Sequence, residues 1–268
     1  MQSIRKLGTI PNQAAAMPEV NTIYIEADED HVAMQKSKAK EMKLITVYES
    51  KVPVCRGRRE VLGQRVCSGW EPPSQIWAEV NQYIQQVYGA KQAPNVMIKG
   101  DAARWITARM GYVEKSHQVV DGYHASQYIR KIAGKETSTP LYKALRTNNQ
   151  DMFIKKVQQR IRRNPQRKKL IMKGYRYIIR NWDGIHEALT RPDAASSTEG
   201  HVRHILSDRL SSRCMGWSPM GAKQMARMRT YVANGGNLEA YALKQFALSP
   251  QAMKPEVNQD VLQKEYIR

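Results

Sequence analysis

The sequence predicts an α/β protein in which a mixed β-sheet is flanked by helices and carries a helical insertion. Before residue 67, short stretches alternate apolar and polar side chains, a pattern typical of antiparallel strands. From 94 to 132 a strand, a helix, a strand and a helix follow one another, which indicates that part of the sheet is parallel. From 135 to 189 a strongly basic segment keeps a helical period, which predicts the insertion.

The first strand begins after residue 20 and ends in an acidic cluster. Ile23, Ile25 and Ala27 alternate with polar residues, and the acids at 28–30 follow directly. Four carboxylates lie between positions 26 and 30. Because these charges repel one another, such a cluster is costly unless a cation binds among them. A solvated acidic turn is the alternative interpretation.

Further strands and helices are expected in order along the chain. Three strands, at 31–35, 44–49 and 59–67, complete an antiparallel meander, and a helix at 75–88 follows. The parallel portion comprises a strand at 94–99, a short helix at 102–110, a strand at 118–120 and a helix at 123–132. Beyond the insertion, one helix carries Glu199 in its first turn, another spans 219–233, and a surface helix ends the chain.

The charge of the insertion is one-sided. Residues 130–180 contain sixteen Lys or Arg and two acids, Glu136 and Asp151. A solvated helix face is one interpretation of such charge, and contact with phosphate is the one we favour. The basic side chains expected to bind DNA, in the insertion and beyond it, are Lys155, Lys156, Arg160, Arg162, Arg163, Arg167, Lys168, Lys169, Lys173, Arg176, Arg209 and Arg213.

Composition agrees with a globular protein that has a polyanionic partner. The 268 residues include 43 Lys or Arg against 24 acids, a net charge of +19, and 41% hydrophobic residues provide for a core. No apolar run approaches the roughly 20 residues that span a bilayer, and the N-terminus lacks a signal-peptide core, so we expect a cytoplasmic protein without a membrane partner. Three cysteines without close pairing signal neither a disulfide framework nor a zinc site.

Three carboxylates occupy positions that suit a metal site. Asp28 and Asp101 each follow a strand, and Glu199 begins a helix beyond the insertion. Carboxylates at a sheet edge and on a covering helix can bind Mg²⁺, or Mn²⁺, and two such ions support an in-line displacement at phosphorus. Spacing alone is weak support, because many chains place carboxylates after strands.

Four stretches, in order, resemble the ISLre-type insertion-sequence transposases, which are related to the mutator-like group. They are YIEADEDHV from Tyr24, GDAARWI from Gly100, VDGYH from Val120 and EGHVRHILSDRLSSRCMGWS from Glu199. The likeness covers about residues 20 to 236. It implies an RNase H-like fold with an Asp-Asp-Glu metal triad and a helical insertion between the second Asp and the Glu.

Carried onto this sequence, the resemblance identifies Asp28, Asp101 and Glu199 as the catalytic and metal-binding triad. Asp28 is chosen because Asp-x-x-His-Val here resembles the mutator-like Asp-x-x-Tyr-Val, while Glu26 and Asp30 remain competitors. Asp30 is also a candidate for support of the metal site.

Two further stretches bear on the site that the resemblance implies. Asp121-Gly-Tyr-His124 is similar to the family's Asp-x-Phe-His element, so Asp121 and His124 are candidates for metal or active-site support, and a buried structural histidine is the alternative. Ala102 stands where the family usually has a second glycine in Gly-Asp-Gly-Ala. That change is mild unless the position requires a positive φ.

The resemblance implies the catalytic domain of a DNA transposase, which cleaves a phosphodiester at the ends of an insertion sequence and joins the freed 3′-hydroxyl to target DNA. We expect residues 1–19 to be a linker left from a missing N-terminal region, 20–250 the catalytic domain with the insertion at about 135–194, and 251–268 a tail. Double-stranded DNA is the expected partner, and transposition mechanics suggest a homo-oligomer. Three alternatives remain open: an inactive fragment, a non-catalytic DNA-binding protein, and an RNase H-like nuclease of repair or recombination.

Overall fold

The structure is a computed structural model that describes residues 20–55, 58–89, 95–108, 113, 115–191 and 198–247. The predicted linker at 1–19 and the predicted tail at 251–268 lie outside the described residues.

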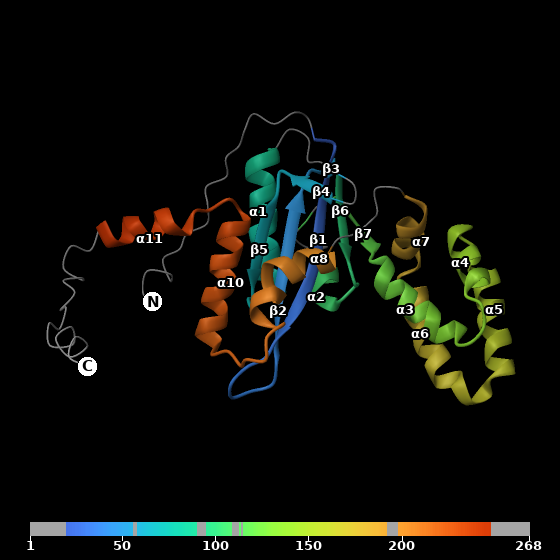
Figure 1. The fold of residues 1–268 in the computed structure, drawn as a ribbon. Coiled ribbons are helices and arrows are strands. Elements are labelled where there is room, and N and C mark those ends of the chain that lie inside the picture. The colour runs from blue at the N-terminus through green and yellow to red at the C-terminus, as the bar shows by residue number, and fades with distance from the viewer. Residues whose placement is uncertain are drawn as a thin grey trace.

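The central sheet of the described part has five strands in the order β5-β2-β1-β6-β7 (Figure 1). Its strands are β1 (Thr22–Val32), β2 (Lys40–Tyr48), β5 (Arg65–Gly69), β6 (Asn95–Gly100) and β7 (Ser116–Val120). β1, β2 and β5 pair antiparallel, whereas β1, β6 and β7 pair parallel. The predicted mixed sheet, antiparallel first and parallel later, is therefore confirmed.

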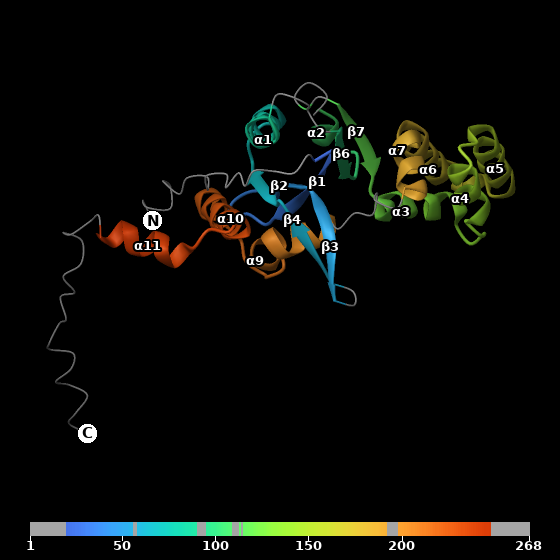
Figure 2. The ribbon, with the colours of Figure 1, turned by 90° about the horizontal axis from the view of Figure 1, so that it is seen from above.

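Helices cover both faces of the sheet, as Figure 2 shows from above. The face that carries Ile23, Ile25 and Ala27 packs against α1 (Pro73–Tyr88) and the short α2 (Arg104–Thr107). The elements over the other face are α8 (Thr198–Val202), the π-helical turn η5 (Arg203–Ser207), α9 (Asp208–Leu210) and α10 (Pro219–Ala233), and α11 (Leu238–Ala247) extends beyond them. Burial on two sides explains why residues 44–48 of β2 form a continuous, largely apolar buried run.

Two sequence predictions about the strands are wrong. No separate strand occupies 31–35, because β1 continues through Val32 and His31 still pairs with Glu41 of β2. The predicted edge strand at 59–67 is divided between β4 (Arg58–Leu62) and β5, with a turn at Gly63, whose φ is 62°. β4 pairs instead with β3 (Ser50–Cys55) in a separate two-stranded hairpin that projects from the body (Figure 2).

The basic insertion is helical, as predicted, and has its own hydrophobic core. Its elements are α4 (Thr139–Arg146), α5 (Gln150–Arg163), the 3₁₀ turn η3 (Pro165–Arg167), α6 (Lys168–Arg180) and α7 (Trp182–Thr190). They pack around α3 (Gly122–Ala133), beyond the β7 edge of the sheet (Figures 1 and 2). Gly174 lets α6 approach α3 closely, because a Cβ there would lie 2.9 Å from the carbonyl oxygen of Tyr128.

None of the helices that the structure describes combines the length and the apolar character needed to cross a membrane. This finding agrees with the absence of a long apolar run in the sequence.

Candidate active site

Asp28 and Asp101 lie at the same edge of the sheet. β1 and β6 are parallel neighbours in which Glu26 is paired with Lys99, and each aspartate lies two residues beyond that pair. Gly100 makes the close approach possible, because a Cβ at this position would lie 2.7 Å from the carbonyl oxygen of Ala27. The structure therefore brings together two of the three predicted triad residues.

The charge of the Asp28 carboxyl group is only partly compensated. Burial raises its pKa to about 6, and the nearby negative charges of Asp101 and Glu29 add to the increase. The backbone N–H of Glu29 donates to Asp28 Oδ1 at 2.8 Å, and His124 also acts to lower the pKa. A half-buried carboxylate with a second carboxylate close by is the environment in which a bound cation is stabilising.

Asp101 is held by a tight turn after β6. Its Oδ1 accepts a hydrogen bond of 2.8 Å from the backbone N–H of Ala103, and between them Ala102 has a φ of 66°. Position 102, where the transposases that the sequence resembles usually have glycine, therefore does adopt a left-handed conformation, and the alanine is strained. The hydroxyl of Tyr177 in α6 donates to the carbonyl oxygen of Asp101 at 2.9 Å, which joins the insertion to this turn.

Asp121 and His124 complete the carboxyl edge on the third parallel strand. The backbone N–H of Asp121 donates to the carbonyl oxygen of Gly100 at 2.8 Å, and its carboxylate caps α3 by accepting from the N–H of Tyr123 at 2.7 Å. His124 lies near enough to Asp28 to lower its pKa, and its Nδ1 is buried without a hydrogen-bond partner among the described residues. Asp121 therefore caps α3, and His124 lies near Asp28.

The structure describes the side chain of Asp30 but not that of Glu199. The backbone of Glu199 lies in α8, which packs on β1, but its side chain lies outside the described part of the chain. Asp30 is buried, and its Oδ1 accepts a hydrogen bond of 2.7 Å from the hydroxyl of Ser211. Among the side chains that the structure describes, no group of three His, Cys, Asp or Glu residues could hold a metal ion.

A group of buried polar residues beside Asp28 was not predicted. This buried polar cluster consists of Glu26, Tyr48, Lys51, Lys99 and His201. The Tyr48 hydroxyl donates to Glu26 Oε1 at 2.8 Å, and Lys51 Nζ lies 2.5 Å from the same oxygen. Burial acts to raise the pKa of Glu26, but His201 and Lys51 lower it to about 2. The sequence held one signal for this cluster. Glu26 and Asp28 are two residues apart in a strand, so their side chains lie on the same face.

Glu29 points to the opposite face of β1, where it meets a tryptophan. The indole N–H of Trp105 donates to its carboxylate, and burial and the nearby Asp101 raise the pKa of Glu29. Trp105 is buried in the core between the sheet and α1, and Trp182 is buried in the core of the insertion. They are therefore packing residues.

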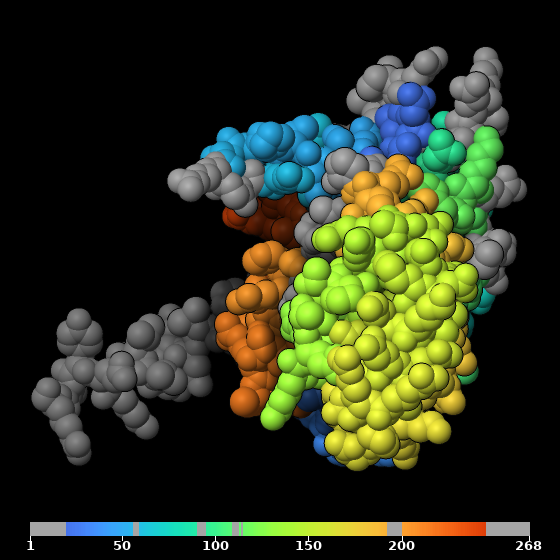
Figure 3. Space-filling model, turned by 90° about the vertical axis from the view of Figure 1, so that its right-hand side faces the viewer, coloured from blue at the N-terminus to red at the C-terminus, as the bar shows by residue number. Residues whose placement is uncertain are grey.

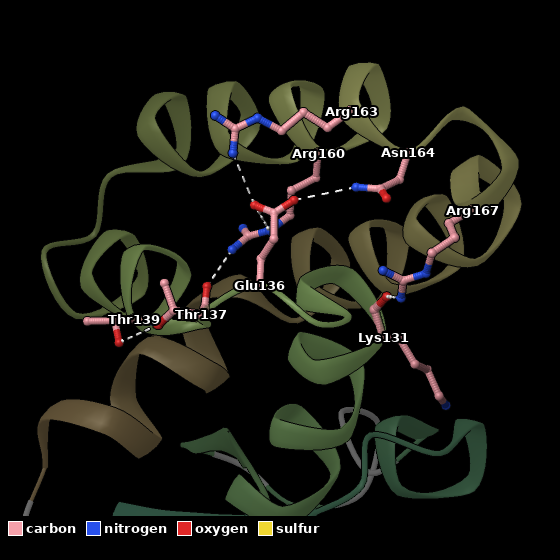
Figure 4. Close-up of polar contacts among 8 residues, drawn as sticks. All are labelled: Lys131, Glu136, Thr137, Thr139, Arg160, Arg163, Asn164 and Arg167. Carbon is pink, nitrogen blue, oxygen red and sulfur yellow. Dashed lines mark hydrogen bonds and ion pairs between the residues drawn. The ribbon is translucent and has the colours of Figure 1, made fainter.

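Not all the predicted DNA-binding residues point to solvent. Arg160 is 4% exposed, because it shares the inner face of α5 with Phe153 and Val157, and its guanidinium donates to the carbonyl oxygen of Thr137 at 2.6 Å (Figure 4). The prediction that Arg160 contacts DNA is corrected: it packs inside the insertion. Glu136 lies 3.4 Å from Arg163 (Figure 4).

The remaining basic residues lie on or near the surface. Arg167 is half-buried and donates to the carbonyl oxygen of Lys131 at 2.9 Å, and Lys156 is also half-buried. The exposed residues of the predicted set are Lys155, Arg162, Arg163, Lys168, Lys169, Lys173, Arg176, Arg209 and Arg213. Figure 3 shows that the helices of the insertion, in green and yellow, form most of the surface at this end of the molecule.

One face of α6 concentrates this charge. Lys169, Lys173 and Arg176 recur at intervals of four and three residues, so they form a line along the helix. The opposite side of α6, with Ile171 and Ile178, packs into the core of the insertion. We call these three residues the α6 basic stripe.

Comparison with known proteins identifies a family. Residues 10–245 match the family described as "Uncharacterised protein family (UPF0236)". Two UPF0236 proteins of Caldanaerobacter subterraneus subsp. tengcongensis are similar to 89% of this chain. One is 31% identical over 252 residues and the other 32% over 253, in each case 52% of the relative's length.

The relatives also show how many copies of the family one genome holds and how much of a relative this chain spans. Each of these two names covers several loci of that bacterium, so the family has many paralogues in one genome. The chain spans about half the length of the curated relatives that it matches. No solved structure matches the chain. Because the family match covers most of its length, this chain belongs to the UPF0236 family.

Proposed function

We propose that this chain is the catalytic part of an insertion-sequence transposase of the ISLre type, in the mutator-like group with an Asp-Asp-Glu site. The single observation that carries the proposal is the pair of Asp28 and Asp101, each two residues beyond the last pair of the parallel β1–β6 ladder. Burial, with the nearby negative charge of Asp101, raises the pKa of Asp28 to about 6. Such a pair suits a divalent cation.

Three further observations support the proposal. The five-strand mixed sheet and the helical insertion between Asp101 and α8 agree with the RNase H-like fold that the sequence resemblance implies. α8 brings the backbone of Glu199 over β1, the strand that carries Asp28. The many paralogues in one bacterial genome are what a mobile element would produce.

Asp28, Asp101 and Glu199 would hold Mg²⁺ or Mn²⁺, and the two carboxylates in the described part fit this role by their oxygen chemistry. When bound, two such ions supply activation of a water or 3′-hydroxyl and stabilisation of the leaving oxygen. His124, with an unpartnered buried Nδ1 beside Asp28, would orient a bound phosphate or water. Recognition of the element's ends is assigned, as part of the proposal, to the half of the relatives that this chain does not match.

The proposed partner is double-stranded DNA, held by the exposed basic residues of the insertion. The α6 basic stripe offers three cations in line, and each contact with a phosphate releases a counterion. DNA affinity is therefore expected to fall steeply with salt. Replacement of all three stripe residues by alanine should flatten the slope of log affinity against log salt by about 2–3.

The test is a nicking assay on supercoiled plasmid with Mn²⁺, comparing the chain with Asp101→Asn. We expect metal-dependent nicking that falls at least about a hundredfold in Asp101→Asn. The matched control is Asp151→Asn, which removes an exposed carboxylate of the insertion and should leave nicking unchanged. DNA binding is measured in parallel by fluorescence anisotropy.

The outcomes separate the competing functions. Absence of nicking by both proteins, with DNA binding intact, would reject catalysis by this chain and favour a non-catalytic DNA-binding protein. Metal-dependent cutting that is much faster on branched DNA than on supercoiled plasmid would favour a nuclease.

A further inference from the structure

The helix that carries Glu199 has little apolar packing of its own. α8 is five residues long, and of its described side chains only Val202 is buried. It follows a segment, 192–197, outside the described residues, and it continues into a π-helical turn. With η5 and α9 it forms one helical segment of 13 residues, in which Ile205, Leu206 and Leu210 join Val202 in the core. A helix of this length is marginal by its own hydrogen bonds, so its position depends on contacts with the sheet, and α8 at its start has the fewest apolar ones.

His201 makes a polar contact between α8 and β1. Its Nδ1 lies 3.0 Å from Oε2 of Glu26, within hydrogen-bonding distance, and the two side chains are 16% and 0% exposed. The imidazole also meets the ring of Tyr48 edge to face, with centroids 6.4 Å apart. Since Oε1 of Glu26 already accepts from Tyr48 and lies against Lys51, the second carboxylate oxygen faces α8.

The contact lies beside the proposed site on both elements. Glu26 precedes Asp28 by two residues on the same face of β1, a distance of about 6.6 Å along a strand. His201 follows Glu199 by two residues in α8, a rise of about 3 Å along a helix. A shift of α8 relative to Glu26 therefore moves Glu199 relative to Asp28 by a similar amount.

We infer that His201 is a positioning residue: its contact with Glu26 sets the place of α8 on β1 and so the distance between Glu199 and Asp28. This inference rests on the proposed function for its consequence, the metal site. The contact between His201 and Glu26, called the His201 anchor, does not depend on the metal site. The anchor and the metal site can therefore be measured separately.

The experiment compares wild type with His201→Ala and His201→Asn. Asparagine places an amide N–H close to the position of Nδ1, so it keeps a polar group against Glu26 Oε2 that alanine removes. The matched control is His204→Ala, in the next turn, where the side chain is 77% exposed and lies 3.6 Å from the carboxylate of Asp208. Two readouts are used: amide hydrogen exchange of 198–207 with EDTA present, and Mn²⁺ binding by calorimetry.

We expect His201→Ala to exchange at least tenfold faster in 198–207 and to bind Mn²⁺ at least tenfold more weakly. His201→Asn should return both values to within about threefold of wild type, and His204→Ala should match wild type. Unchanged exchange in His201→Ala overturns the anchor, whether or not Mn²⁺ binds. Faster exchange with unaltered Mn²⁺ affinity overturns the positioning of Glu199. If wild type binds no Mn²⁺, the proposed function fails, and the exchange data still decide the anchor.

Discussion

Glu26 and Asp28 are separated by one residue on β1 and lie on the same face of the sheet. Glu26 is buried and Asp28 is half-buried, yet their pKa values shift in opposite directions. Burial acts to raise the pKa of both carboxyl groups. For Glu26, contacts with His201 and Lys51 overcome burial and lower the pKa to about 2. For Asp28, the nearest charged residues include Asp101 and Glu29, and the pKa reaches about 6.

The difference separates a structural carboxylate from one that can bind a cation. Glu26 already has two basic side chains at hydrogen-bonding distance, so an added metal ion would replace existing stabilisation. Asp28 has a second carboxylate as a neighbour, so an added metal ion would relieve repulsion. For this reason Glu26, a competitor for the first metal ligand by sequence, is the weaker candidate.

The largest expected effect follows from removing the charge of Glu26. Glu26→Gln leaves Lys51 beside a neutral amide in a buried site, so the free energy of unfolding at pH 7 should fall by about 3–4 kcal/mol. Urea denaturation followed by circular dichroism measures this change.

The pH dependence provides the control for Glu26. Its folded pKa of about 2 lies below the ordinary value of 4.5, so its stabilisation is complete above pH 4.5 and is lost as pH falls toward 2. The difference between wild type and Glu26→Gln should therefore shrink at pH 3. Equal stability of the two proteins at pH 7 would contradict the structural role of Glu26.

The charge of Asp28 is expected to have the opposite effect on the free energy of unfolding. Its folded pKa of about 6 lies above the ordinary 3.8, so the ionised carboxylate destabilises the fold above pH 6, and this effect is relieved as pH falls toward 4. Asp28→Asn removes the charge and should raise the free energy of unfolding at pH 8 by about 2–3 kcal/mol, with almost no gain at pH 4. Thermal melts at the two pH values in EDTA measure it.

Mn²⁺ sharpens this test of Asp28. Under the proposed function, Mn²⁺ stabilises wild type at pH 8 and has little effect on Asp28→Asn. Equal stabilisation of both proteins would show that Asp28 is not a metal ligand. Its raised pKa would then have no part in the proposed function.

Sequence patterns predicted the parts of this comparison that depend on local periodicity. The alternation of Ile23, Ile25 and Ala27 placed β1, and the predicted strand ends at 28 and 101 placed both carboxylates at one edge, although β1 in fact continues to Val32. The length of β1 was missed, because the strand continues through polar residues whose partners lie far along the chain. Asp30, for example, is buried against Ser211, which is 181 residues away.

The same reason explains why the buried polar cluster and the role of Arg160 could not be read from sequence. Glu26 depends on His201, a residue 175 positions away, which no local pattern connects to it. Arg160 looks like any other arginine in a basic helix until packing places it beside Phe153 and Val157. Charge counts predict that a surface is basic, but they do not separate exposed cations from buried ones.

The smallest expected effect tests whether backbone strain beside Asp101 contributes to the raised pKa of Asp28. Ala102 has a φ of 66°, which glycine adopts without strain, so Ala102→Gly should raise the free energy of unfolding by about 0.5–1 kcal/mol. Ala102→Val is the matched opposite, because a β-branched residue is least tolerated at positive φ and should lower it by about 1–2 kcal/mol. Chemical denaturation measures both changes. Since glycine keeps the turn that lets Ala103 donate to Asp101, the pKa of Asp28, followed by NMR, should stay near 6 in Ala102→Gly. A clear fall in that pKa would mean that the strained turn, rather than the sheet, holds Asp101 against Asp28.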